Sequence, residues 1–153
     1  MQDILVTDGV VTAFGPGLAQ QYEAQGGDLA AIEVVDLGGK LVCPPFCDTH
    51  LHLDYVFTAR KPGAVNESGT LFEGIQRWSE TKSDLTVDEI KQRAKIGIKK
   101  EMLHGVQLIR SHADVTDPNL TSLKALLELK EELKDTVTLQ IVSFPQEGMY
   151  SYE

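Results

Sequence analysis

Residues 40–54, KLVCPPFCDTHLHLD, decide the fold that this sequence predicts. The apolar run from Leu41 to Cys47 leads directly into the polar residues around His50 and His52. An apolar run of this length is typical of a buried strand in a sheet that helices cover. We therefore expect a buried strand here, with a polar cluster at its carboxyl end.

Downstream of this strand, the order of expected elements is helix, helix, strand, helix, strand. The helices are expected at 71–82, 86–104 and 117–134, and the strands at 106–115 and 137–144. A capping box from Thr86 to Glu89 begins the second helix and Gly105 ends it. Asp117 followed by Pro118 is typical of a third helix start. Strands that alternate with helices predict an α/β fold with a parallel sheet.

The first 40 residues have a different pattern. Two β-branched runs within residues 3–12 flank Asp8-Gly9, which predicts a β-hairpin. Glycine and proline between residues 14 and 29 predict a loop with one helical turn near residues 18–22. Residues 32–36 are expected to form another short strand.

Composition and charge limit the classes of partner. The 153 residues carry 14 Lys and Arg against 23 Asp and Glu, a formal net charge of −9. This balance argues against a nucleic-acid partner. The sequence lacks an apolar run of 18 residues and a secretory leader, and it has only two cysteines, so we expect a cytoplasmic protein that does not bind membranes.

The pair His50 and His52 is the main candidate for chemistry. Strand residues two apart project to the same side, so both imidazoles can bind one divalent ion such as zinc or iron. Asp48 and Asp54 favour this interpretation, because carboxylates often orient ligand histidines. The alternative is that both histidines are partly exposed residues at a strand end, with no ligand.

Two cysteines offer a competing interpretation. Cys43 and Cys47 precede the histidine pair closely enough to suggest a structural zinc site with four ligands. However, Pro44-Pro45 stiffens the chain between them and their neighbours are apolar. We therefore expect both thiols to be small buried hydrophobic groups.

Four segments carry a resemblance to a known family. Residues 40–54 resemble the first barrel strand of the amidohydrolase superfamily, whose His-x-His pair holds a catalytic metal ion. NESGTLFEGIQRW (66–78), RSHADV (110–115) and LQIVSFPQEG (139–148) are similar to the cytosine deaminases of that superfamily. The resemblance implies the N-terminal part of a TIM (β/α)8 barrel, preceded by part of a small β-sandwich. Residues 1–40 would belong to the sandwich and 41–153 would be the first three βα units.

The resemblance also implies an activity. The expected reaction is hydrolysis of cytosine to uracil and ammonia, with a metal-activated hydroxide as nucleophile. His50 and His52 would hold one divalent ion, Fe2+ or Zn2+. The side chain of Gln146 and the main-chain carbonyl of Leu71 would bind the pyrimidine. The catalytic acid/base and the remaining ligands are expected beyond Glu153, so the isolated chain should have little activity, and the full-length enzyme is expected to be a homo-oligomer.

Several alternatives stay open. The substrate could be a triazine or another amino-substituted N-heterocycle, and the chain could instead be a non-catalytic assembly module. Glu147 could be taken for the acid/base, although the family places that residue on a later strand. His112 and Asp114 either line the pocket or form hydrogen bonds within a barrel layer. Trp78 and Phe72 could stack on a base, but the helical spacing of Trp78 favours a place in the core.

Overall fold

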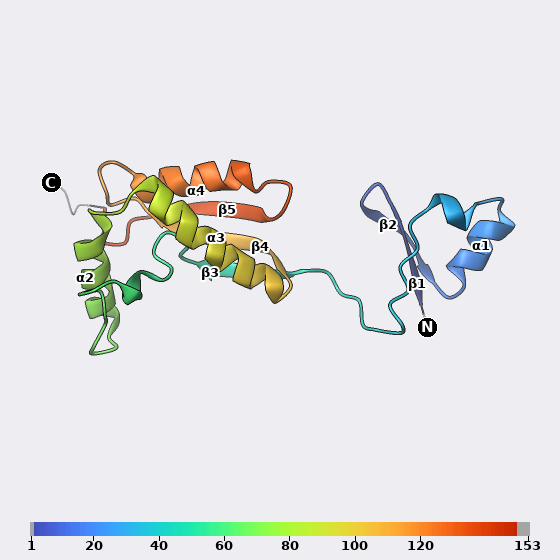
Figure 1. The fold of residues 1–153 in the computed structure, drawn as a ribbon, viewed down its shortest axis with the longest axis horizontal. Coiled ribbons are helices and arrows are strands. Elements are labelled where there is room, and N and C mark those ends of the chain that lie inside the picture. Colours follow the sequence, from blue (N-terminus) through green and yellow to red (C-terminus); the bar gives the residue numbers. More distant parts are fainter. Residues whose placement is uncertain (1, 150–153) are drawn as a thin grey trace. The chain divides into compact units, whose positions relative to one another are not determined.

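The computed structural model of this protein describes residues 2–149 and divides the chain into two compact units (Figure 1). The first unit comprises residues 1–43 and the second residues 44–153. Each unit has its own sheet. None of the helices described within residues 2–149 is long and apolar enough to cross a membrane.

The first unit is built on the expected hairpin. Strands β1 (Asp3–Thr7) and β2 (Val10–Gly15) pair antiparallel. Asp8 and Gly9 both have positive φ, 51° and 76°, as a two-residue hairpin turn of type I′ requires. Helix α1 (Leu18–Ala24) and a 3-10 turn, η1 (Leu29–Ala31), follow. The helical turn expected near residues 18–22 is therefore confirmed and extends to Ala24.

The strand expected at residues 32–36 is wrong. Residues 33–37 have no regular secondary structure, and Val34 and Val35 are more than 60% exposed. A β-branched run becomes a strand only when a neighbouring strand pairs with its backbone groups. Within the described residues of this unit, β1 and β2 pair only with each other.

The second unit contains the parallel sheet. Its strands are β3 (Phe46–Leu51), β4 (Val106–Asp114) and β5 (Thr138–Phe144), in the order β3-β4-β5. Both pairings are parallel, which confirms the expected mixed α/β architecture. A 3-10 turn, η2 (Thr58–Arg60), and three helices, α2 (Leu71–Lys82), α3 (Val87–Leu103) and α4 (Thr121–Glu132), complete the unit.

Helices α3 and α4 cover one face of this sheet and contact each other (Figure 1). Alternate residues of β4, Ile109, Ser111 and Ala113, are buried on the helix side, whereas Arg110 on the other face is exposed. The core also contains Leu53, Ile90, Ala94, Ile98, Leu126, Leu129 and Leu139. The two-residue alternation places Arg110 and His112 of β4 on the open face, whereas Ser111 lies on the helix side.

Strand β3 differs from the expectation in two ways. It begins at Phe46 rather than Leu41, because Pro44 and Pro45 have no N–H to donate to a sheet. It is also mostly exposed, since it lies at the edge of the described sheet. Cys43 and Cys47 are exposed too, so their expected burial is wrong.

The helix boundaries follow the local signals with one exception. The capping box of Thr86 and Glu89 is present, and Gly105, with φ 86°, follows the end of α3. Helix α4, however, begins at Thr121 instead of residue 117. The carboxylate of Asp117 accepts the N–H groups of Asn119 and Thr121, so it caps a turn ahead of the helix.

Candidate functional site

Three histidines gather at the carboxyl ends of β3 and β4. The Nε2 atoms of His50 and His52 lie 3.2 Å apart. The ring of His112 stacks on His50, with the ring centroids 4.1 Å apart and an interplanar angle of 22°. The strand spacing thus brings the His50 and His52 imidazoles together, and their role as metal ligands stays a prediction.

The distance between the two Nε2 atoms fits a shared divalent ion. Nitrogen ligands of a tetrahedral zinc ion, each about 2.0–2.1 Å from the metal, lie roughly 3.3 Å apart. Burial, and then the nearby charges of His50 and His112, lower the pKa of His52, which favours the neutral form that binds metals. Across residues 2–149, no cluster of three or more His, Cys, Asp or Glu side chains could hold a metal ion. The four-ligand site of Cys43, Cys47, His50 and His52 is therefore not formed among these residues, and the His50–His52 pair stays a predicted part of a larger ligand set.

The two aspartates beside the histidines accept hydrogen bonds from main-chain N–H groups. Asp48 accepts the main-chain N–H of His50 at 2.9 Å. Asp54, which is fully buried, accepts the main-chain N–H of Asp114 at 2.9 Å. The expectation that these carboxylates orient the imidazoles is therefore wrong, and Asp54 instead joins the segment after β3 to the end of β4.

Aromatic rings hold His52 in place. Its ring stacks on Tyr55, with centroids 4.7 Å apart at 26°, and meets Phe144 edge-on at 5.4 Å. The Nδ1 atom of His52 is buried and has no hydrogen-bond partner among the described residues. Ring packing, rather than a carboxylate, thus fixes the direction of this imidazole.

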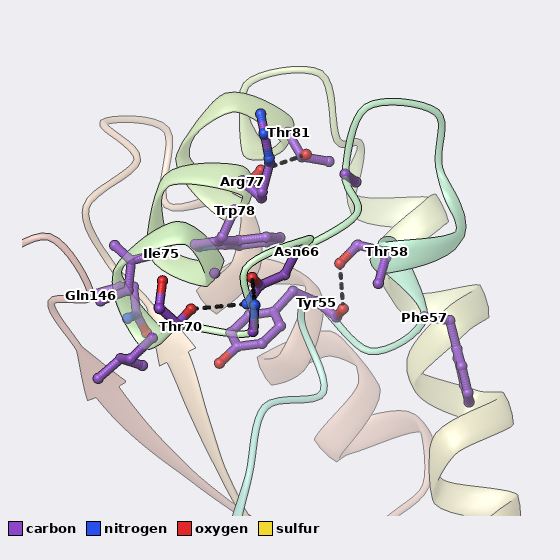
Figure 2. A pocket seen from close by; sticks show the side chains of 15 residues that line it. Tyr55, Phe57, Thr58, Asn66, Thr70, Ile75, Arg77, Trp78, Thr81 and Gln146 are labelled. Atoms are coloured by element: carbon purple, nitrogen blue, oxygen red, sulfur yellow. Dashed lines mark hydrogen bonds between the residues drawn. The ribbon is translucent and has the colours of Figure 1, made fainter.

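A cavity of about 490 Å³ lies beside Tyr55 and Trp78 (Figure 2). Tyr55 lines it and also touches His52, so one ring separates the cavity from the histidine pair. Leu71 and Gln146, the two residues expected to bind a pyrimidine, both line this cavity. The structure therefore brings the predicted metal and substrate residues into one region, although they come from widely separated parts of the chain.

Trp78 forms another wall of the cavity and is part of the core, as its helical spacing predicts. It is 5% exposed, and its ring centroid lies 4.8 Å from that of Tyr55. Its indole N–H donates to Asp114 at 2.6 Å. Phe72, by contrast, is 83% exposed and does not line the cavity, so it cannot be part of a stacking platform there.

The sequence did not predict the buried Lys82, which lies beside the cavity. The Nζ atom of Lys82 lies 2.5 Å from Glu147, 2.6 Å from the Thr116 hydroxyl and 3.4 Å from Asp114. Lysine is almost always exposed, so its type predicts a solvated residue. One signal was present, since Lys82 lies four residues after Trp78 and hence on the same helix face. The ion pair also shows that Glu147 serves a structural contact here.

The pKa values of the two buried carboxylates in this region, Asp54 and Asp114, are shifted in opposite directions. Burial would raise the pKa of Asp114, but hydrogen bonds from Thr116 and Trp78 and the charge of Lys82 together lower it. Burial raises the pKa of Asp54 to about 6. Burial, followed by the two nearby carboxylates, raises the pKa of Tyr55 to about 12, so its hydroxyl stays protonated at neutral pH.

The loop before α2 is held by the first turn of that helix. The Glu73 carboxylate accepts the N–H groups of Glu67 at 3.1 Å and Ser68 at 2.6 Å. Asn66 donates to the carbonyl of Thr70 at 2.9 Å (Figure 2). These bonds fix the approach of the chain to Leu71, whose carbonyl is the expected substrate contact.

Comparisons with known proteins point to one family. The profile of the Amidohydrolase family matches residues 33–152. N-isopropylammelide isopropyl amidohydrolase of Pseudomonas sp. (strain ADP) is 35% identical over 120 residues, which are 76% of this chain and 30% of that protein. Pterin deaminase of Rhizobium rhizogenes is 27% identical over 152 residues, 96% of this chain and 32% of that protein.

Solved structures agree with this result. The crystal structure of 5-methylcytosine deaminase from Klebsiella pneumoniae, liganded with 5-fluorocytosine, matches with a TM-score of 0.77 and 42% identity. The match covers 97% of this chain and 34% of that one. N-isopropylammelide isopropylaminohydrolase from Burkholderia multivorans shares the fold, with a TM-score of 0.68 at 24% identity. The chain thus spans about a third of the length of the relatives that it matches.

Proposed function

The chain belongs to the amidohydrolase family, and on this basis we propose that it contributes to the hydrolytic deamination of cytosine to uracil and ammonia. It would supply the first part of a TIM barrel, with a partial β-sandwich before it and the later strands contributed by further residues. Its substrate would be a free nucleobase, which is neutral and needs no basic surface, in keeping with the net charge of −9. The complete enzyme would be a homo-oligomer.

One arrangement carries this proposal. The Nε2 atoms of His50 and His52 lie 3.2 Å apart, and Tyr55, which stacks on His52, lines the cavity that Leu71 and Gln146 also line. A hydrolase of this kind needs a metal site directly beside the pocket for the ring that it attacks. The two features lie side by side at the carboxyl ends of parallel strands, where α/β enzymes place their active sites.

The residues of the candidate site would have separate roles in the hydrolysis. Members of this superfamily are typically metal-dependent, and a divalent ion held by His50 and His52, Fe2+ or Zn2+, would supply activated water for the hydrolysis. The Gln146 amide can donate and accept, which matches the donor and acceptor edge of a pyrimidine. The Leu71 carbonyl adds a second acceptor. The acid/base that moves the proton would come from the remainder of the barrel.

A second candidate rests on a specific observation. The Pseudomonas relative at 35% identity is named for N-isopropylammelide rather than a pyrimidine. Several apolar residues line the cavity, and they would also accept a heterocycle with an alkylated amino group; among them are Phe57, Ala59, Ala64 and Ile75. The alternative substrate is therefore an amino-substituted triazine. A non-catalytic assembly role is the third possibility.

Complementation tests the proposal. We would mix this chain with the part of the Klebsiella 5-methylcytosine deaminase that follows the matched third, add Zn2+ or Fe2+, and measure ammonia release from cytosine and from an N-alkyl aminotriazine. We expect release from cytosine by the mixture and none by either part alone. Chains with His50→Ala or His52→Ala should be inactive, and His104→Ala should behave as the unaltered chain.

Each other result contradicts a part of the proposal. Turnover by this chain alone would contradict the incompleteness of its site. Faster release from the triazine would favour the second candidate. If calorimetry shows no cytosine binding and the mixture releases no ammonia, the enzyme proposal fails and the assembly role remains.

A further inference from the structure

We propose that Lys82 is a positioning residue that holds Glu147 and thereby fixes the side chain of Gln146 in the cavity. This inference rests on the proposed function in one respect, the role of Gln146 as a substrate contact. The restraint on the turn around Gln146 can be measured without any substrate.

Three oxygen atoms of the described residues lie around the ammonium group of Lys82. Its side chain is 8% exposed, and Asp114, Thr116 and Glu147 each place an oxygen within 3.4 Å of Nζ. An ammonium group has three N–H donors, so each of these oxygens can receive one. A lysine buried to this extent is stable only when it is paired in this way.

The turn that carries Gln146 is closed on itself. The N–H of Gly148 donates to the carbonyl of Pro145 at 3.0 Å, which makes Gln146 and Glu147 the two central residues of a four-residue turn. Glu147 is the turn residue that reaches Lys82, and its side chain is 19% exposed. An ion pair to Glu147 therefore restrains the whole turn, including the adjacent Gln146.

The same helix carries the other expected substrate contact. Leu71 is the first residue of α2 and Lys82 is its last. Trp78, one turn before Lys82, joins the helix to Asp114, the last residue of β4. Leu71 and Gln146 both line the cavity. With Lys82 holding the turn, helix α2 therefore supports both expected substrate contacts.

Two substitutions isolate this contact. Glu147→Gln keeps the shape of the turn residue but removes its charge. Lys82→Met keeps the length and apolar stem of the side chain but removes all three donors. Lys82→Arg restores the charge and serves as the conservative rescue. Lys91→Met is the matched control, because Lys91 pairs with Glu128 and Glu132 on the α4 side and does not reach the turn.

Hydrogen exchange of the Gly148 amide tests the restraint directly. In the 153-residue chain we expect this amide to exchange roughly tenfold faster or more in Glu147→Gln and Lys82→Met, because the turn opens locally. It should exchange at the unaltered rate in Lys82→Arg and Lys91→Met. Unchanged exchange in Glu147→Gln would overturn the proposal, and this variant also decides the matter if Lys82→Met does not fold.

Cytosine affinity, measured by calorimetry on the same variants, tests the consequence. We expect the Kd for cytosine to rise about tenfold in Glu147→Gln and in Lys82→Met. The variant that carries both substitutions should bind cytosine as tightly as either single variant, because both remove the same contact. Normal affinity in variants whose turn exchanges faster would overturn the positioning role while the proposed function stands. If the unaltered chain does not bind cytosine and its mixture with the Klebsiella part releases no ammonia, the proposed function fails, and the Gly148 exchange rates alone decide whether Lys82 holds the turn.

Discussion

The indole N–H of Trp78 donates a 2.6 Å hydrogen bond to the carboxylate of Asp114, and both side chains are almost completely buried. This bond joins helix α2 to the last residue of strand β4. A buried carboxylate is stable only with enough donors, and Thr116 and Lys82 supply the others. The position of the cavity wall therefore depends on a polar contact inside the core.

Replacing Trp78 by Phe should destabilise the chain measurably. The ring would still fill most of the space, but the Asp114 carboxylate would lose a donor in a buried place. We expect a loss of about 1–3 kcal/mol in the free energy of unfolding, measured by urea denaturation and circular dichroism. Phe72→Leu on the same helix is the control, with a change within roughly 0.5 kcal/mol because Phe72 is exposed. Equal effects of the two substitutions would contradict this account.

Alanine substitutions at Gly97, inside α3, and at Gly105, just after the end of this helix, should have opposite effects on the stability of the chain. A Cβ at Gly97, inside the helix, would meet Leu53 Cδ2 at 3.4 Å, an ordinary contact. Gly97→Ala should therefore stabilise the chain by about 0.5–1 kcal/mol through helix propensity. Gly105 has φ 86°, so Gly105→Ala should destabilise it by roughly 1–2 kcal/mol. Thermal unfolding of both variants checks the pair, and a loss of stability in Gly97→Ala would show that the helix has no room there.

The stabilisation of the loop before α2 by the Glu73 carboxylate should decrease in acid. Hydrogen bonds from Ser68, and then from Glu67, lower the pKa of Glu73 to about 2 from its ordinary value of 4.5. The unfolded chain therefore binds more protons between these values, so the stability that Glu73 contributes is complete above pH 4.5 and is lost as the pH falls toward 2. Carboxyl NMR of Glu73 should follow this titration, and amide signals of residues 67 and 68 should shift with it.

Glu73→Gln serves as the test variant for this loop. It should remove the part of the acid dependence that Glu73 causes, whereas Glu101→Gln on α3 should leave the stability profile as it is. An ordinary titration of Glu73 near pH 4.5 would mean that the loop does not hold the carboxylate in solution.

Metal binding should depend on the histidine pair. We expect His50→Ala and His52→Ala each to lower Zn2+ affinity tenfold or more, an order of magnitude typical for the loss of an imidazole ligand. Isothermal titration calorimetry measures this loss. His104→Ala is a suitable control, because His104 lies at the end of α3 and its Nδ1 contacts the carbonyl of Lys100. Equal affinities in all three variants would remove the histidine pair as the binding site.

Local signals in the sequence predicted the helices well. Helix α2 has the expected bounds, and the capping box at Thr86 places the start of α3, because both depend on residues within one turn. The strands at 106–115 and 137–144 were also placed to within a residue or so at either end. Two element starts were displaced by local features, α4 by the Asp117 turn and β3 by the prolines before it. The other failures depend on distant partners. The residues at 32–36 lack a strand beside them, and β3 is exposed because it lies at the edge of the described sheet.

The candidate site shows the same difference between local contacts, which the sequence predicts, and contacts between distant residues, which it does not. The two-residue strand period was enough to bring His50 and His52 together, since their contact is local. The ion pair of Lys82 and Glu147 joins residues 65 positions apart, and no pattern in the sequence connects them. The tasks of Asp48 and Asp54 were misjudged for a related reason, because a carboxylate beside a histidine can serve any donor that the fold brings near.

The sequence contains a single tryptophan, and the fold has placed it in the wall of the cavity. Its indole touches Tyr55 and the Asp114 carboxylate, so its ultraviolet emission reports on this one place and on no other part of the chain. A shift in the emission maximum would register water entering the cavity or a ring sliding against the indole. The chain thus has a built-in optical probe at the position where its chemistry is proposed.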